Sequence, residues 1–408
     1  MRILFLTPQL PYPPHQGTAL RNYGLIAGLA RRHQVSLLSF QETLGETTRP
    51  ARETDLTPLT TLCQRMETVP VPRRTSGQRV LALFLSRRPD MALRLASPTF
   101  EARLIAWLAR EPFDIVHIEG IEMAPYLPVV ASARPRPLIV YDDHNCEYLL
   151  QKRAFLTDLR HPRRWVGAAY SFVQWQRLAR FEAAVCRAAD RVLAVSEPDA
   201  AMLRRLVPGL EPTVIPNGID TARYRERVGE PEVKMGSAAL VFTGKMDFRP
   251  NVDAVLWFAE TVLPRVRAQV PEAHFVVVGQ RPHRRLARLR NRPGITLTGW
   301  VADVRPYIAR AAVYVAPLRI GGGTRLKLLE AMAMERAIVA TRLGAEGFPV
   351  TAGRELLLAD RPEAFAQAVV ALLRDPARRA ALGAAARAFV VRHYDWQVII
   401  PRLEAVYG

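Results

Sequence analysis

The chain has 408 residues, and its 57 basic against 38 acidic side chains give a formal net charge of +19 at pH 7. This length favours two or three domains, and a hydrophobic content of 49% with 23% charged residues excludes an intrinsically disordered protein. The three cysteines stand far apart with no CxxC pair, which argues against a disulfide framework or structural zinc and favours the reducing cytoplasm.

The N-terminal stretch MRILFLTPQLPYPPHQG meets prolines soon after a short apolar run, so it lacks the pattern of a secretory signal peptide. No window approaches the roughly 18 uninterrupted apolar residues of a transmembrane helix. We therefore expect a cytoplasmic protein whose membrane contact, if any, is peripheral and at the inner face of the plasma membrane.

The first half of the chain alternates predicted strands and helices. The apolar run Arg2–Thr7 predicts a strand buried on both faces, and a helical pattern spans 18–31 after a loop containing Gly17. Further strands are predicted at 34–40, 114–117, 137–141 and 191–195. Such alternation predicts an α/β protein with a doubly wound parallel sheet.

A second α/β region follows a polar interval at 217–237, which is predicted to be a linker. Its strands are predicted at 239–242, 274–278, 295–297, 313–316 and 337–340. We expect two Rossmann-like domains facing each other, with the ligand beyond the carboxyl ends of the strands. The predicted boundaries are 1–216 for the first domain, 217–388 for the second, and 389–408 for a helix returning to the first.

The segment RIGGGTRLKLLEAMAM (319–334) leaves a predicted strand and enters a predicted helix. Glycines allow the backbone to approach a ligand closely, and the free amides and dipole of a helix N-terminus favour a phosphate group. Arg325 and Lys327 add positive charge, and Glu330 lies where a carboxylate could accept hydrogen bonds from sugar hydroxyls. The alternative is an ordinary glycine-rich connection to an amphipathic helix.

Several motifs, which follow one another along the chain in the order and at the spacing of a known family, resemble the retaining glycosyltransferases of family 4, which have the GT-B fold. They are GGGTRLKLLEAMAM, AIVAT, GAEG, AADRVLAVSE, VIPNGID, VFTGKMDFRPNVDAV, HFVVVGQ and ITLTGWVADVRPYIARAAVYVAPL. The resemblance implies a hexosyltransferase-like enzyme that uses a nucleotide-diphosphate sugar, with UDP or GDP as the nucleotide. It also implies that the enzyme needs no cofactor and no metal. The implied acceptor is a glycan or a lipid-linked saccharide in cell-envelope or exopolysaccharide synthesis.

The resemblance also implies roles for single residues on the donor side. Family members carry Glu-x7-Glu, and the second Glu, which contacts the donor ribose, is Glu330. The first Glu falls on Gly322, which departs from the pattern; the amides of Gly322, Gly323 and Thr324 could still serve the sugar and diphosphate. Gly17 matches the family's glycine loop near the donor diphosphate, with a turn that caps the first helix as its alternative.

The family's basic pair for the diphosphate follows the first strand of the second domain. Lys245 matches its first member, whereas the second falls on Pro250, so Arg249, Arg325 or Lys327 could supply the missing charge. Around Trp300 and Val301 the family holds the base with backbone groups, and Trp300 could pack on the base or in the core.

Polar residues at 142–145 end a predicted strand, where they are costly unless they line a cleft or cap a helix. His144 matches a first-domain histidine near the transferred sugar, so we predict His144, Lys245 and Glu330 as catalytic residues. Asp143, Asn145 and Glu147 are acceptor-side candidates, with an N-cap role for Asp143 or Asn145 as the alternative. His117 is a further candidate, or else a packed structural histidine. The spacing fits no known metal-ligand set.

Two first-domain segments, 71–88 and 152–180, combine apolar side chains with arginines. They favour an anionic membrane surface, with a solvated arginine-rich surface as the alternative. No reader motif for nucleic acid is visible. Competing functions are a degenerate GT-B sugar-nucleotide-binding protein without turnover and a GT-B epimerase. The sequence has no recognisable cofactor lysine motif, which argues against a phosphorylase. A dinucleotide oxidoreductase would need GxGxxG, but Gly17 stands alone without that motif.

Overall fold

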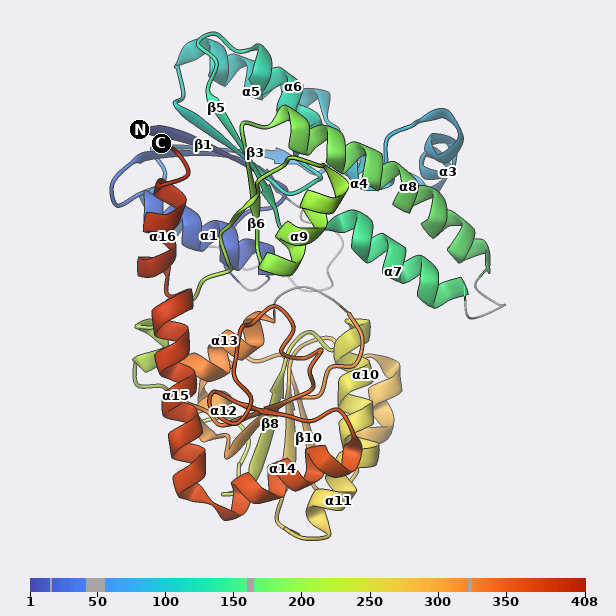
Figure 1. Cartoon of the computed structure of the whole chain (residues 1–408), viewed down its shortest axis with the longest axis vertical. Coiled ribbons are helices and arrows are strands. Elements are labelled where there is room, and N and C mark those ends of the chain that lie inside the picture. The colour runs from blue at the N-terminus through green and yellow to red at the C-terminus, as the bar shows by residue number, and fades with distance from the viewer. Residues whose placement is uncertain (15–16, 42–55, 160–164, 322–324) are drawn as a thin grey trace. The chain divides into compact units, whose positions relative to one another are not determined.

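The computed structural model describes residues 1–14, 17–41, 56–159, 165–321 and 325–408 (Figure 1). The chain divides into two compact units, and each is described by itself. Unit 1 comprises Met1–Gly218 and Ile399–Gly408, and unit 2 comprises Ile219–Val398.

Unit 1 is built on a seven-stranded sheet in which every neighbouring pair is parallel. Its strands are β1 (Arg2–Thr7), β2 (Gln34–Gln41), β3 (Arg65–Pro70), β4 (Ile115–Glu119), β5 (Leu138–Asp143), β6 (Arg191–Ala194) and β7 (Thr213–Val214). The strand order is β3-β2-β1-β4-β5-β6-β7, so the winding direction reverses between β1 and β4. In open parallel sheets, ligands bind at the carboxyl ends of the strands beside such a reversal.

The helices of unit 1 connect these parallel strands and cover the sheet. They are α1 (Gly17–Leu29), α2 (Thr57–Leu62), α3 (Ser76–Leu85), α4 (Asp90–Arg94), α5 (Pro98–Arg110), α6 (Leu127–Ser132), α7 (Glu147–Leu159), α8 (Trp165–Ala188) and α9 (Glu197–Leu206). Helix α5 begins where its sequence favours a start, because Ser97 accepts a hydrogen bond from the Phe100 amide and Pro98 occupies the first turn.

The last helix, α16 (Trp396–Glu404), carries the chain back into unit 1, where its C-terminal part packs on α1 (Figure 1). A Cβ built on Gly28 of α1 would lie 2.3 Å from Cγ1 of Ile400, so only glycine permits this approach. Glu404 fixes the same contact from the other end, since its carboxylate pairs with Arg32 and His33.

Unit 2 repeats the same winding pattern in a six-stranded parallel sheet. Its strands are β8 (Ala239–Thr243), β9 (His274–Val278), β10 (Ile295–Gly299), β11 (Val313–Ala316), β12 (Ile338–Ala340) and β13 (Leu357–Leu358). Their order is β10-β9-β8-β11-β12-β13, with the reversal between β8 and β11. The helices are α10 (Arg249–Trp257), α11 (Leu263–Arg267), α12 (Arg305–Arg310), α13 (Leu326–Ala333), α14 (Pro362–Arg374) and α15 (Pro376–Tyr394).

The strands that the sequence predicts are all present, with ends that move by at most two residues. Three further strands were not predicted: β3 carries charged residues, and β7 and β13 are only two residues long. The C-terminal region is also not one helix over 389–408, because α15 ends at Tyr394 and α16 begins at Trp396. In the part of the chain that is described, no helix is both long and apolar enough to span a bilayer.

Candidate functional site

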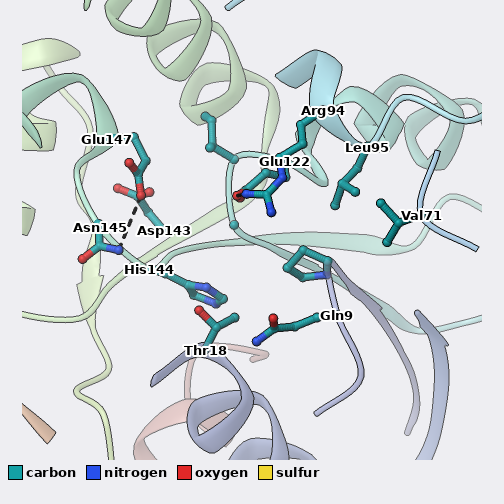
Figure 2. A pocket seen from close by; sticks show the side chains of 13 residues that line it. Gln9, Thr18, Val71, Arg94, Leu95, Glu122, Asp143, His144, Asn145 and Glu147 are labelled. Atoms are coloured by element: carbon teal, nitrogen blue, oxygen red, sulfur yellow. Dashed lines mark hydrogen bonds and ion pairs between the residues drawn. The ribbon is translucent and has the colours of Figure 1, made fainter. Parts of the chain in front are cut away.

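A polar pocket of about 270 Å³ lies at the reversal point of the unit 1 sheet (Figure 2). Residues that follow β1, β4 and β5 form most of its wall, together with Thr18 of α1. The lining residues are Pro8, Gln9, Thr18, Val71, Arg94, Leu95, Gly120, Ile121, Glu122, Asp143, His144, Asn145 and Glu147. The structure thus brings together four of the predicted first-domain residues: Asp143, His144, Asn145 and Glu147.

His144 is held at the pocket wall by a buried carboxylate. Its Nε2 lies 2.8 Å from Oε2 of Glu119, the fully buried last residue of β4. Burial raises the pKa of Glu119, but hydrogen bonds from His117 and His144 outweigh that effect and lower the pKa to about 2. For His144, burial lowers the pKa, but the hydrogen bond to Glu119 and the charges of Asp142 and Glu119 raise it above its usual value.

Beneath this wall, a buried ion pair joins α1 to β5. The guanidinium of Arg21 contacts both carboxylate oxygens of Asp142, at 2.8 and 2.9 Å, and both side chains are almost wholly excluded from solvent. Arg21 also donates to the Ile215 carbonyl at 2.9 Å and to Oδ1 of Asn217 at 3.2 Å. Because the charge of Arg21 is fully satisfied, the pair fixes α1, and with it Thr18, against the strand that leads to His144.

Removing one member of this pair is expected to destabilise unit 1. In an Asp142→Ala variant the guanidinium of Arg21 stays buried without its carboxylate, which costs about 3–5 kcal/mol of unfolding free energy. Urea denaturation followed by circular dichroism measures the loss. The matched control is Glu197→Ala, because the Glu197–Arg204 pair is solvent-exposed and should contribute little. Equal stability of the two variants would contradict this reading of the pair.

A second group of carboxyls forms the other side of the pocket. The Tyr141 hydroxyl donates to Oδ1 of Asp143 at 3.2 Å, and burial together with neighbouring negative charges raises the pKa of Asp143 well above its usual value. Burial, followed by the charge of Glu122, raises the pKa of Glu147 to about 7. The raised pKa of both carboxyls favours the protonated form, which can donate a hydrogen bond as well as accept one.

The N-terminus of α7 is capped differently from the sequence-based alternative. Glu182 of α8 accepts hydrogen bonds from the amides of Glu147 and Tyr148, at 3.0 and 3.1 Å. Asn145 instead donates to Oε1 of Glu147 at 3.4 Å. The capping group thus comes from a distant part of the chain, and Asp143 and Asn145 stay at the pocket wall.

His117 does not line the pocket, although the sequence makes it an acceptor-side candidate. It is fully buried and stacks on Phe5, with ring centroids 4.5 Å apart. Its Nδ1 lies 3.1 Å from Oε1 of Glu119, and its Nε2 lies 2.7 Å from the Tyr407 hydroxyl. The burial of this ring favours the alternative of a packed structural histidine, because no surface of the ring is open to an acceptor.

The donor-side residues of unit 2 meet at the carboxyl end of β8. Lys327, in the first turn of α13, donates from Nζ to Oδ1 of Asn251 at 2.8 Å and lies 4.1 Å from the ring centroid of Phe242. Asn251 in turn donates to the Lys245 carbonyl at 2.9 Å. A Cβ built on Gly244 would lie 2.8 Å from Nζ of Lys327, so this glycine is needed for the ammonium to sit there.

The charge of Lys327 in this cluster can respond to a bound anion. Burial, reinforced by the positive charge of Arg325, lowers the pKa of Lys327 to about 7. One turn further on, Glu330 accepts a hydrogen bond from the Tyr224 hydroxyl at 2.9 Å. Burial raises the pKa of Glu330, while the bond from Tyr224 and the charge of Lys327 oppose that effect. A phosphate group placed beside Lys327 would restore its full positive charge.

The remaining predicted residues take varied positions. Gly17 is the first residue of α1, and Arg249 is the exposed first residue of α10. Trp300 is 56% exposed after β10, so it does not serve as core, and the next residue, Val301, packs against the core of unit 2. Lys245 is partly exposed and Arg325 is buried. Gly322, Gly323 and Thr324 lie outside the described residues.

Four residues of the two clusters escaped the sequence-based prediction: Arg21, Glu119, Tyr224 and Asn251. Glu119 offered a recognisable pattern, since an acidic residue two positions after a predicted buried strand is as costly to bury as the polar residues at 142–145. Arg21 offered a weaker one, as a single charge on an otherwise apolar helix. No local sequence pattern marks Tyr224 or Asn251, because their hydrogen-bond partners lie 106 and 76 residues away along the chain.

Two groups of side chains come close enough to hold a metal ion in the described part of the chain. In the first, Glu119, Asp142 and His144, the carboxylates already pair with Arg21 and the two histidines. In the second, Asp143, Cys146 and Glu182, burial raises the pKa of the Cys146 thiol, which opposes the thiolate that a metal requires. Neither donor set fits a resident cation well.

Two parallel sheets in the same Rossmann order, each with its polar cluster at the reversal point, are the two domains of the GT-B fold. Residues 16–223 match the family described as Glycosyltransferase Family 4, and residues 237–375 match Glycosyl transferases group 1. The chain belongs to glycosyltransferase family 4, as the resemblance predicted.

Curated relatives and solved structures agree with this assignment. A phosphatidyl-myo-inositol mannosyltransferase of Mycolicibacterium smegmatis is 31% identical over 210 residues, which is 49% of this chain and 52% of that protein. A glycogen synthase of Mycobacterium tuberculosis is 29% identical over 259 residues, which is 60% of this chain and 59% of that protein. The chain thus spans little more than half the length of the curated relatives it matches.

Solved structures match along the whole chain. Anabaena HepE in complex with UDP superimposes with a TM-score of 0.66 at 14% identity, covering 100% of this chain and 99% of that one. Sucrose-phosphate synthase from Thermosynechococcus elongatus gives a TM-score of 0.69 at 17% identity, covering 100% and 98%. At these identities the match supports the fold alone.

Proposed function

We propose that this chain is a retaining glycosyltransferase that moves a sugar from a nucleotide-diphosphate sugar to a glycan or lipid-linked acceptor. The observation that carries the proposal is the cluster of Lys327, Asn251 and Glu330 at the reversal point of unit 2, in a chain of glycosyltransferase family 4. The ammonium of Lys327 suits a diphosphate, and the carboxyl of Glu330, one turn further along α13, suits the hydroxyls of a ribose.

UDP or GDP is the proposed nucleotide. HepE, one of the fold neighbours, was solved with UDP and with UDP-glucose, which supports a UDP-sugar. The relatives named as phosphatidyl-myo-inositol mannosyltransferases support instead a lipid-linked acceptor and a role in building the cell envelope.

The proposed reaction breaks the bond between the anomeric carbon and the diphosphate oxygen. The acceptor oxygen forms its new bond on the same face of the sugar, and the acceptor proton passes to the leaving diphosphate. Negative charge therefore grows on the diphosphate in the transition state, and preorganised positive charge lowers the barrier most. In this proposal Lys327 and Lys245 supply that charge in unit 2, and the pocket of unit 1, with His144 in its wall, receives the acceptor.

The test is a donor-cleavage assay on the whole chain. UDP- and GDP-hexoses are incubated with the protein, and release of the nucleoside diphosphate is followed together with the anomeric configuration of the sugar product by NMR. Release with retained configuration, even when water is the acceptor, supports the proposal. A folded protein that binds a donor and never cleaves it would instead be the binding protein without turnover.

We also propose that unit 1 contacts an anionic membrane through three of its helices. Figure 1 shows α3, α7 and α8 on one side of unit 1, and the Arg177 guanidinium of α8 donates to the Leu83 carbonyl of α3 at 2.6 Å. Most exposed large apolar side chains in the described chain lie on these helices: Leu81, Phe84, Leu85, Leu156, Leu159, Trp165, Val166, Tyr170 and Phe172. Exposed Arg87 and Arg88 follow α3 directly and complement anionic lipid.

Exchanging Phe84 and Leu85 for serine is expected to weaken vesicle binding at least 10-fold. Both are more than three-quarters exposed, and each apolar side chain of this size contributes about 1.5–3 kcal/mol when fully buried. Flotation with vesicles of phosphatidylglycerol or phosphatidylcholine measures the effect. Ile105→Ser is the control, since Ile105 is also exposed but lies on α5. Equal binding of the double variant and the control, or a preference for neutral vesicles, would remove the proposal.

A further inference from the structure

A row of buried polar side chains runs from the pocket of unit 1 to the C-terminal segment of the chain. Glu119 lies at its centre, with Oε2 on His144 at 2.8 Å and Oε1 on His117 at 3.1 Å. Beyond His117, the hydroxyl of Tyr407 approaches Nε2 at 2.7 Å. Glu119 and His117 are fully buried, whereas His144 and Tyr407, at the two ends of the row, are partly exposed.

The direction of each hydrogen bond follows from Glu119. A carboxylate only accepts, so the proton between it and His144 belongs to Nε2, and the proton between it and His117 belongs to Nδ1. Nε2 of His117 then accepts from the Tyr407 hydroxyl. Burial raises the pKa of Tyr407 well above its usual value, which keeps that proton in place. Each of the three hydrogen bonds in the row therefore has one donor, on His144, His117 or Tyr407, and one acceptor.

His144 lines the pocket, and its other ring nitrogen, Nδ1, lies on the side of Gly120 in the same wall. A Cβ built on Gly120 would lie 3.6 Å from Nδ1 of His144, and both residues line the pocket wall. Gly120 has a φ of +83°, a conformation that glycine adopts without strain, and it turns the chain away from the ring immediately after Glu119. Figure 2 shows the imidazole directed into the pocket near Thr18 and Gln9.

We propose that Glu119 is a positioning residue, which holds His144 as the Nε2–H tautomer and so presents Nδ1 to the pocket as a hydrogen-bond acceptor. The inference rests on the proposed function only for its effect on turnover. Both oxygens of Glu119 are engaged, by His144 and by His117, so the carboxylate cannot rotate away. His117 and Tyr407 thus act through Glu119, and they explain why a buried histidine and a C-terminal tyrosine meet at this place.

Other charged groups surround His144 and are part of the same arrangement. Asp142 lies 4.0 Å from Nε2, and the charge of Arg21, paired with Asp142, partly offsets it. Because Asp142 is neutralised by Arg21, Glu119 is the carboxylate that determines where the imidazole proton lies. The orientation of His144 should therefore depend on Glu119 far more than on Asp142.

The direct test is NMR of the whole chain labelled with ¹⁵N-histidine. In the wild-type protein above the pKa of His144, we expect a protonated Nε2 and an unprotonated Nδ1, which have well-separated nitrogen shifts. The opposite tautomer, or a mixture of the two, would overturn the proposal without any variant. This readout does not require turnover, so it separates failure of this inference from failure of the proposed function.

The Glu119→Gln variant tests the consequence. An amide of the same size can accept from one histidine only, and it has no charge to hold the imidazolium. We expect kcat to fall about 10- to 100-fold with the KM for the donor unchanged, and the pKa of His144 to fall. Glu197→Gln is the control for the same exchange on the surface. Tyr407→Phe, which keeps the ring, should lower kcat by a smaller factor.

An unchanged His144 titration in a folded Glu119→Gln variant would show that Glu119 does not position the ring. A fall in kcat accompanied by an equal loss of donor affinity would instead indicate a general structural role. Either result would overturn the proposal.

Discussion

Replacing Lys327 with methionine is expected to weaken donor binding about 10- to 100-fold, because a hydrogen bond to a charged group contributes about 1.5–3 kcal/mol. Methionine preserves the length of the side chain and its packing on Phe242. Isothermal titration with a UDP- or GDP-sugar measures the affinity. The expected loss is confined to binding of the diphosphate, so a nucleoside without phosphates should bind the variant and the wild type equally.

The affinity of the wild type should also depend on pH. The pKa of Lys327 is lowered to about 7 in the unliganded protein, and a bound diphosphate raises it again. Below about pH 7 the ammonium is already charged, and affinity is at its maximum. Above that value, donor binding must take up a proton, so affinity falls with rising pH until the pKa of the complex is reached. Titration in buffers of different ionisation enthalpy measures the proton uptake.

Arg310→Met provides the matched control, since Arg310 is an exposed arginine of unit 2 that pairs with Glu230. It should leave donor affinity and its pH dependence unchanged. If Lys327→Met bound the donor like the wild type, or if the affinity were flat between pH 6 and about 9, the diphosphate would not lie beside Lys327.

Replacing His144 with alanine is expected to lower kcat about 100-fold or more while the KM for the donor changes little. The donor cluster lies in unit 2, whereas His144 belongs to the pocket of unit 1, so we expect His144 to contribute to the transfer step and not to donor binding. Steady-state kinetics at saturating donor measure both constants.

The control for this variant is His274→Ala. His274 lies at the start of β9 and hydrogen-bonds Thr296, at the opposite end of the unit 2 sheet from the donor cluster. A His144→Ala enzyme with wild-type kcat would exclude this histidine from the reaction. A loss confined to donor KM would move it from the transfer step to donor binding.

The sequence predicted the sheets well because buried parallel strands are continuous apolar runs. It located Asp143, His144, Asn145 and Glu147 together because the polar residues directly follow such a run, and chain direction alone places them at one sheet edge. The same reasoning did not separate His117 from them. His117 lies within β4, and its side chain packs in the core against Phe5 and Tyr407. A strand pattern does not reveal these partners.

On the donor side, the resemblance directed attention to Lys245 and to the loss of a basic residue at Pro250. Of the alternatives Arg249, Arg325 and Lys327, the structure brings Lys327 to the loop after β8. Asn251, which follows Pro250, holds the ammonium of Lys327 beside Gly244, so a cation reaches the β8 loop from α13. This arrangement depends on contacts between residues 76 positions apart, which no local pattern carries.

We expect unit 2 to bind a nucleotide-diphosphate sugar. The decisive experiment is ligand-observed NMR of the purified chain against UDP-, GDP- and ADP-sugars, with and without EDTA. One UDP- or GDP-sugar should bind selectively, EDTA should not alter its binding, and Glu330→Ala should weaken it. Binding of no nucleotide sugar by the folded wild-type protein would contradict this expectation.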